Sequence, residues 1–424
     1  MRLEVIDNHR SRFAPVPVGW HQRKMRFAVA HYQTEKNRDE NPTVLSLTKT
    51  GLKVKTDLAF GKSTENYVGH QIVKAGQFVF TPRDFDATPI LCGVADTEGC
   101  ISNLYIVFDV HPQIYGRFLE YYFWGLKFGF GFFEKLSFGM RYSFNRTQFE
   151  NIPLLYPAPE TQKAIADFLD RETARIDQLI EKKQRLVAVL KERLLTELER
   201  LTTATEPLHS ELVPFRWVCR ITEGQVDPTA PEWADKPLIA PNHIASRTGR
   251  LIEIETAEDQ GAISGKYAFP AGTVLYSKIR PNLAKACVSP VAGMCSADMY
   301  PILPHKSLRS QFLLMQLLSA KFTDWATLES MRVAMPKINR ETLGGYRFWV
   351  PALSIQDEAI KCFSAEREAV EQLSDKVSES IVQMREFRSA LITSAVTGQI
   401  DVATWGKHGL TDRRLDQIQE AMGV

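Results

Sequence analysis

The sequence has 424 residues, with 52 Lys and Arg residues against 50 Asp and Glu residues, a formal net charge of +2, 44% hydrophobic residues and 24% charged residues. At roughly 100–200 residues per domain, this length predicts two to four domains, and the composition excludes a disordered chain. The near-neutral charge also excludes a protein that is basic along its whole length, such as a histone-like DNA coat, but it is compatible with local basic patches.

Neither a membrane span nor a secretion signal is apparent. No apolar run reaches the ~18 residues that a membrane-spanning helix needs, and the first residues, MRLEVIDNHRSRFAPV, lack an apolar signal core. The six cysteines form no CxxC pair and no zinc-binding spacing, so we expect reduced, mostly buried thiols. These features predict a cytoplasmic location.

Residues 1–155, which we call the first head, contain short apolar or alternating runs between Gly, Pro and Asn residues. Examples are GQFVF at 76–80 and ISNLYIVF at 101–108. This pattern predicts short strands joined by turns.

Residues 156–205 change to a helical pattern. Apolar residues recur at spacings near three and four, and Pro157 and Pro159 precede the stripe. A period of 3.5 residues with charges on the other faces is typical of a coiled-coil helix. The predicted seam residues are Ile165, Leu169, Ile176, Leu179, Leu186 and Leu190.

The same order, a strand-like pattern followed by a helical one, then recurs in the second half of the chain. Residues 206–350, the second head, combine strand-like runs such as GTVLY at 272–276 with a helical run at 311–319, so α+β is the expected fold class. Residues 351–400 form a second coiled-coil helix, and residues 401–424 form a C-terminal tail. The predicted seam residues of the second helix are Val370, Leu373, Val377, Met384 and Leu391.

Internal similarity indicates that the chain contains two copies of one module. VKAGQFVF at 73–80 matches FPAGTVLY at 269–276, and PAPETQ at 157–162 matches PALSIQ at 351–356. Cys92 and Cys100 match Cys287 and Cys295, and every offset lies between 194 and 196. We therefore predict a duplicated module of roughly 195 residues with pseudo-two-fold symmetry.

Two long helices of equal length can pair antiparallel, each hiding the apolar seam of the other. Such a pair would place the two heads at opposite ends and space them apart, because ~40 helical residues span ~60 Å. The alternative is that both stripes are core helices of two large domains.

Charge and polar clusters point to the heads as binding surfaces. The heads carry 19 basic against 15 acidic residues and 16 against 14, whereas residues 156–205 are balanced and residues 351–424 are acidic. Turn-like segments of the heads hold Lys and Arg, which bind phosphates or guanine edges, and Asn, Ser and Thr, which contact bases or the backbone. The candidate DNA-binding residues are Thr48, Lys49, Thr50, Lys53, Lys55, Arg83, Arg141, Asn242, His243, Ser246, Arg247, Arg250, Lys278, Arg280, Asn282, Lys285 and Arg332.

Catalytic motifs are missing from the sequence. It contains no Asn-Pro-Pro-Tyr tetrapeptide of amino-methyltransferases, no HExxH and no GxSxG. The FGFG segment at 128–131 lies among bulky aromatic residues, which favours packed core over a cofactor loop. No catalytic residues and no metal ligands are predicted.

The sequence resembles specificity (S) subunits of type I restriction–modification systems. The resemblance rests on PAPETQ and PALSIQ, each running into a coiled-coil helix, on GTVLYSKIRPNL at 272–283 and on ALITSAVTGQID at 390–401. Residues 1–70 match the family pattern only loosely. This resemblance implies that each head is a target recognition domain for one half of a bipartite double-stranded DNA site.

The resemblance also implies partners. Two methyltransferase (M) subunits would dock on the helices and bring S-adenosylmethionine and adenine methylation, and two restriction (R) subunits with ATP and Mg could join them. The chain itself would bind no cofactor and catalyse nothing. Two alternatives stay open: a single-chain DNA methyltransferase or nuclease with a divergent active site, and a structural coiled-coil scaffold.

Overall fold

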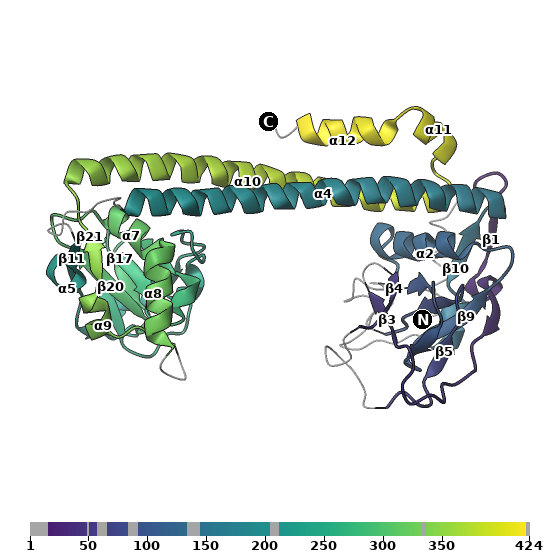
Figure 1. Cartoon of the computed structure of the whole chain (residues 1–424), viewed down its shortest axis with the longest axis horizontal. Helices are drawn as coiled ribbons and strands as arrows, with labels where there is room; N and C mark the ends of the chain where they lie inside the picture. The colour runs from purple at the N-terminus through teal and green to yellow at the C-terminus, as the bar shows by residue number, and fades with distance from the viewer. Residues whose placement is uncertain are drawn as a thin grey trace. The chain divides into compact units, whose positions relative to one another are not determined.

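The computed structural model describes residues 16–48, 51–56, 66–83, 92–133, 145–203, 212–331 and 336–420. It has the predicted α+β class and divides into two compact units, unit 1 (residues 1–184 and 376–424) and unit 2 (residues 185–375). Each unit contains one head and a part of both long helices (Figure 1). No helix in these described ranges is long and apolar enough to cross a membrane.

Unit 1 is built around a four-stranded antiparallel sheet. Its order is β2 (Val29–Tyr32), β9 (Ile106–Val110), β6 (Phe78–Phe80) and β7 (Cys92–Val94). Three antiparallel pairs complete the head: β1 (His21–Lys24) with β10 (Pro153–Tyr156), β3 (Leu45–Thr48) with β4 (Gly51–Val54), and β5 (Gln71–Val73) with β8 (Gly99–Ile101).

Unit 2 contains a corresponding four-stranded sheet. Its order is β12 (Cys219–Ile221), β20 (Met299–Pro304), β17 (Val274–Ser277) and β18 (Ala286–Val288). A five-stranded sheet follows the order β13 (Gln225–Val226), β16 (Lys266–Phe269), β19 (Gly293–Cys295), β14 (Pro237–Ile239) and β15 (Glu255–Thr256). The pair β11 (Leu212–Pro214) and β21 (Arg347–Trp349) lies where β1 and β10 lie in unit 1.

The four-stranded sheets of the two heads share one strand order, which confirms the predicted duplication. The order β12-β20-β17-β18 repeats the order β2-β9-β6-β7. The turn before the third strand of each sheet holds a glycine at positive φ, Gly76 at +86° and Gly272 at +81°, a conformation that side chains disfavour. Helices α2 (Gly116–Trp124) and α7 (Ser310–Leu318) lie 194 residues apart.

Apolar side chains fill both heads. In unit 1 the rings of Phe78, Phe80 and Phe108 are fully buried, and the centroids of Phe78 and Phe108 lie 5.3 Å apart. All six cysteines are free thiols, and five of them are buried, as predicted. Burial raises the pKa of the Cys287 and Cys295 thiols to about 12, so both stay protonated at neutral pH.

The FGFG segment packs against a long helix. It begins within a π-helical turn, η3 (Gly125–Gly129), whose glycines face helix α10 (Leu353–Val396). A Cβ atom on Gly125 would lie 2.8 Å from Val396, and one on Gly129 would collide with Thr393. These glycines let the end of α2 approach α10. The packed-core interpretation is wrong for the segment itself, because Phe128 is 47% exposed, and it applies only to the Phe132 and Phe133 rings that follow, which are buried.

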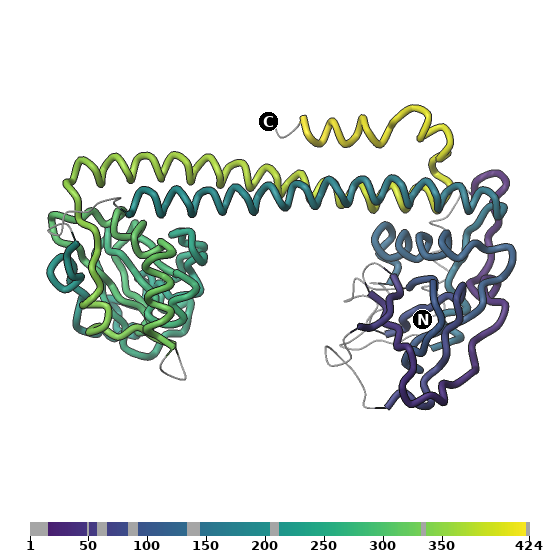
Figure 2. Tube along the Cα trace, in the orientation of Figure 1, coloured from purple at the N-terminus to yellow at the C-terminus, as the bar shows by residue number. Residues whose placement is uncertain are grey.

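The long helices α4 (Pro159–Thr202) and α10 run antiparallel. In unit 1 the Arg388 Nε atom lies 2.9 Å from Asp177 Oδ1, and in unit 2 the Arg193 Nε atom lies 3.1 Å from Glu366 Oε1. Residues further along α4 therefore pair with residues nearer the start of α10. The two traces lie side by side in Figure 2.

The predicted seam residues differ in burial. Leu186 is 44% exposed, which corrects the prediction at this position, because the 3.6-residue period of a helix drifts from a strict heptad. Leu179, Leu190 and Leu373 are half-buried. The buried positions are Ile165, Leu169, Ile176, Val370, Val377, Met384 and Leu391.

The C-terminal tail forms two helices in unit 1, α11 (Val402–Lys407) and α12 (Leu410–Glu420). Leu415 and Ile418 of α12 are buried, and Asp412 pairs with Arg175 of α4. The tail therefore packs on the helix pair.

A buried glutamine anchors each long helix to its head. The Gln162 Nε2 group donates to the carbonyl oxygens of Gln113 and Pro157, both at 2.8 Å, and its Oε1 accepts from the Tyr115 backbone N–H at 2.8 Å. Gln356 repeats the pattern 194 residues later, and both side chains are fully buried. Gln356 contacts the carbonyl oxygens of Ser307 and Pro351, both at 2.8 Å, and the backbone N–H of Arg309 at 2.9 Å.

Replacing either glutamine by leucine should destabilise the unit that holds it. Gln356→Leu leaves two carbonyl oxygens and one N–H without partners in a buried site, at a cost of about 2–4 kcal/mol in the free energy of unfolding. Urea denaturation of the full chain measures this, with Gln178→Leu on the exposed face of α4 as the control. Equal stabilities for Gln356→Leu and Gln178→Leu would contradict the anchoring role.

Candidate nucleic-acid interface

The connection between β17 and β18 in unit 2 is a rigid basic loop. The Ser277 N–H donates to the Lys285 carbonyl at 2.9 Å, which closes the loop, and η7 (Pro281–Leu283) forms its tip. Arg280 and Ala284, on either side of η7, have φ values of +48° and +43°. Left-handed backbone at a non-glycine residue costs about 1–2 kcal/mol and persists only where neighbouring contacts hold it.

Two other segments supply those contacts. The Arg280 N–H donates to the Pro336 carbonyl at 3.0 Å, and the Ile338 N–H donates to the Lys278 carbonyl at 2.9 Å. On the other side, the Arg247 N–H donates to the Ala284 carbonyl at 3.2 Å. Three chain segments, around residues 247, 280 and 337, are thereby joined into one surface.

Arg247 is itself held in a left-handed conformation, with a φ of +62°. Its Nη2 atom donates to the Asn282 carbonyl at 3.3 Å. All three described non-glycine residues with positive φ, Arg247, Arg280 and Ala284, therefore lie in this one cluster. Such clustering of backbone strain is typical of binding sites.

The cluster presents cations to solvent. Arg247, Arg250 and Arg280 are exposed, and no carboxylate among the described residues lies within ion-pair distance of their guanidinium groups. A guanidinium group that is not neutralised by the protein offers several N–H donors to a phosphate or a guanine edge. Asn242, Ser246 and Asn282 are also exposed and lie on the same two loops.

Three further cations are partly used by the protein. The Lys278 ammonium lies 5.4 Å from the centre of the Tyr300 ring, and the Arg340 guanidinium lies 5.8 Å from it. Arg340 Nη1 also lies 2.8 Å from Glu223 Oε1. Lys285 Nζ donates to the Pro241 carbonyl at 2.6 Å and so ties the two loops together.

His243 is a supporting residue and not a contact residue, which corrects its prediction. Its side chain is only 3% exposed. Its Nδ1 accepts from the Ala240 N–H at 3.2 Å, and its Nε2 lies 3.3 Å from Glu255 Oε2. A buried imidazole between these partners holds the loop from beneath and cannot reach an external polymer.

The candidates of the first head are less closely gathered. Thr48 and Lys53 lie on the β3–β4 hairpin, where Thr48 Oγ1 donates to the Gly51 carbonyl at 2.8 Å. Lys53 is exposed, Lys55 is half-buried just after β4, and Arg83 is exposed just after β6. Lys49, Thr50, Arg141 and Arg332 lie outside the described residues.

The structure adds one basic residue to the cluster of unit 2. Lys337 pairs with Ile279 through an isolated antiparallel bridge, which brings it beside Arg280. A lone lysine in a loop carries no distinguishing signal in the sequence. Two residues later the repeat is visible again, because Asn339 caps α9 (Arg340–Gly345) just as Asn145 caps α3 (Arg146–Glu150).

The described residues contain no cluster of three or more His, Cys, Asp or Glu side chains that could hold a metal ion. The strongest chemical feature of unit 2 is therefore a rigid, cationic and hydrogen-bonding surface. It is suited to binding an anionic polymer with a defined shape.

A curated protein and several solved structures are similar to this chain in sequence or fold. No family model matches the sequence. The type I restriction enzyme EcoDI specificity subunit of Escherichia coli is 33% identical over 167 residues, which are 39% of this chain and 37% of that subunit. The chain therefore aligns with little more than a third of the relative's length.

Two solved structures share the fold. A chain from a structure on complex assembly and conformational transition of the type I R-M system has a TM-score of 0.71 at 15% identity, over 91% of this chain and 99% of that chain. The HsdS subunit from Thermoanaerobacter tengcongensis has a TM-score of 0.52 at 16% identity over the same shares. The resemblance to type I specificity subunits is confirmed, by sequence for part of the chain and by fold for nearly all of it.

Proposed function

We propose that the chain is a non-catalytic subunit that reads double-stranded DNA for a type I restriction–modification system. Each head reads one half of a bipartite site, and helices α4 and α10 dock two methyltransferase subunits, with which restriction subunits can assemble. S-adenosylmethionine, ATP and Mg are carried by those partners. The part-length likeness to the EcoDI specificity subunit and the shared HsdS fold support this proposal.

The observation that carries the proposal is the cluster of unit 2. Three exposed arginines stand on loops that other segments fix through backbone hydrogen bonds. Fixed loops lose little conformational entropy on binding, so their donors can discriminate base edges as well as bind phosphates. Arginine is the residue most often found on guanine O6 and N7, and asparagine pairs with adenine N6 and N7.

The duplication supports a bipartite target. Two heads with one topology but different loops are suited to two half-sites of different sequence. The two four-stranded sheets have the same strand order, whereas residues 81–91, between β6 and β7, differ in sequence from residues 278–285, between β17 and β18.

Exchanging the second head tests whether each head reads its own half of the site. With residues 206–350 replaced by those of another specificity subunit, the chain and its M protein should methylate a site in which one half is changed and the other is kept. Genome-wide mapping of methylated adenines in cells that express both proteins provides the measurement. Two unchanged halves would exclude the proposed role of this head.

Arg280→Ala and Arg247→Ala should each weaken binding of the cognate duplex or relax the half-site read by unit 2. The expected cost is about 1–3 kcal/mol if a base is contacted. Arg220→Ala, at an exposed position on β12, is the matched control and should change neither property. If both cluster variants behaved like Arg220→Ala, the cluster would be ordinary solvated surface.

Val377→Asp should prevent both helix pairing and M-subunit binding, because Val377 is 1% exposed and an aspartate there would be buried without a partner. Val382→Asp, at a 51% exposed position of the same helix, should leave pairing intact. Size-exclusion chromatography with the M protein, together with circular dichroism, measures both. A normal complex with Val377→Asp would show that the seam is placed wrongly.

A further inference from the structure

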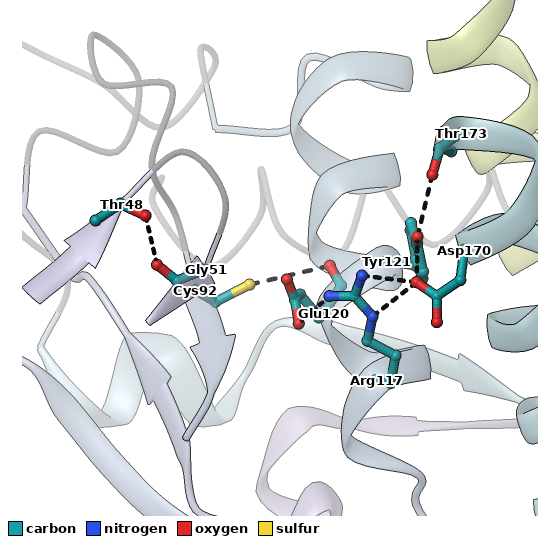
Figure 3. A network of polar contacts seen from close by, with 8 residues as sticks. All are labelled: Thr48, Gly51, Cys92, Arg117, Glu120, Tyr121, Asp170 and Thr173. Atoms are coloured by element: carbon teal, nitrogen blue, oxygen red, sulfur yellow. Dashed lines mark hydrogen bonds and ion pairs between the residues drawn. The ribbon is translucent and has the colours of Figure 1, made fainter. Parts of the chain in front are cut away.

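A network of charged and hydroxyl groups joins α2 to α4 in unit 1 (Figure 3). Arg117 Nη1 lies 2.8 Å from Glu120 Oε2, and Arg117 Nε and Nη2 donate to Asp170 Oδ1 at 3.0 and 2.6 Å. The Tyr121 hydroxyl donates to the same Asp170 oxygen at 2.8 Å and lies 3.3 Å from Thr173 Oγ1. One carboxylate oxygen of α4 thus accepts three hydrogen bonds from α2.

The network extends from α2 to the strand and hairpin beside the candidate DNA-binding residues Thr48 and Lys53. The Cys92 thiol of β7 lies 3.9 Å from the Glu120 carbonyl, and the Val94 backbone hydrogen-bonds to the Glu120 carboxylate. The β3–β4 hairpin packs on the same strand, because a Cβ atom on Gly93 would lie 3.1 Å from the Leu52 nitrogen. Figure 3 shows Thr48 and Gly51 of the hairpin, the contact of Cys92 with Glu120, and the hydrogen bonds of Arg117 and Tyr121 to Asp170.

The second copy of the module keeps the helix packing without these charges. At the offset of 194, Arg117, Glu120 and Asp170 correspond to Gln311, Leu314 and Ser364. Leu314 is buried, and it packs against the loop of unit 2 that carries Arg247: a Cβ atom on Gly249 would lie 3.2 Å from Leu314 Cδ2. The fold of the module therefore does not require the charged groups.

Stability gives no reason for their presence in unit 1. The Glu120 side chain is 8% exposed, and burial raises its pKa while Arg117 opposes this shift. A buried charge pair is often no more stabilising than well-packed apolar residues of similar volume. The charged groups instead restrict the orientation of α2 on α4. Several short hydrogen bonds to one oxygen fix the angle between the two helices more closely than apolar contacts do.

We propose that Arg117, Glu120 and Asp170 are positioning residues that hold β7 and the β3–β4 hairpin of the first head in one orientation on α4. This inference rests on the proposed function, because that orientation determines how the first head meets its half-site. In unit 2 Leu314 stands at the position of Glu120, and its apolar contact replaces the charged contacts.

The test transfers the residues of the second copy into the first. The triple variant Arg117→Gln/Glu120→Leu/Asp170→Ser, as the full chain with its M protein, should unfold within about 2 °C of the parent. Its methylation should lose fidelity at the first half-site only. The ratio of methylation at cognate sites to that at sites with one mismatch in this half should fall roughly 10- to 100-fold, the size of effect that a misplacement of about 1 Å produces.

Two further variants make the result specific. Arg117→Lys keeps the charge but loses the forked contact with Asp170, so it should fold normally and show part of the same loss. Arg309→Gln/Asp357→Ser removes an exposed ion pair between the second head and α10, and it should leave the first half-site unchanged.

The possible results distinguish a failure of this inference from a failure of the proposed function on which it rests. A triple variant with a much lower unfolding temperature, or with both half-sites read as in the parent, would overturn the positioning role alone. A parent complex that methylates no bipartite site would overturn the proposed function, and the positioning role with it.

Discussion

The structure of each unit depends on one buried glutamine at the start of a long helix. Gln162 and Gln356 each satisfy two carbonyl oxygens and one N–H that would otherwise be buried without partners. The amide ties the end of the last strand, the entrance of α2 or α7 and the first turn of the long helix together. Glutamate cannot replace it, because a carboxylate has no N–H to offer to two carbonyl oxygens.

The anchor is the same in both copies, whereas the contacts between each head and its long helix differ beside it. Unit 1 adds the charged groups of Arg117, Glu120 and Asp170 between α2 and α4, whereas unit 2 places Leu314 at the position of Glu120. A fixed anchor with variable surroundings allows a head to change its loops while the helices keep their register.

Much of the fold could be predicted from the sequence, because repeats and helical periodicity are properties of the order of residues. The PAPETQ and PALSIQ segments are the anchors themselves, so they identified the repeat for a physical reason that only the hydrogen bonds reveal. Leu186 and His243 show the limit of this approach. Periodicity does not report where a helix drifts from its partner, and a histidine between polar residues gives no sign that it lies beneath a loop. Lys337 joined the cluster through a bridge to Ile279, and no spacing in the chain encodes that contact.

The near-neutral net charge also follows from how the candidate interface is built. Of its cations, Lys285 is bonded to a carbonyl, Arg340 faces Glu223, and Lys278 lies over Tyr300. Arg247, Arg250 and Arg280 are exposed and have no carboxylate of the described residues within ion-pair distance, although Arg247 Nη2 donates to the Asn282 carbonyl. Because the salt-dependent part of DNA affinity scales with the number of phosphates neutralised, a few exposed arginines supply a small non-specific contribution. The specificity of such a surface depends more on the fixed orientation of its hydrogen-bond donors than on its charge. We therefore expect tight DNA binding by the proposed complex to need contacts from its partner subunits as well.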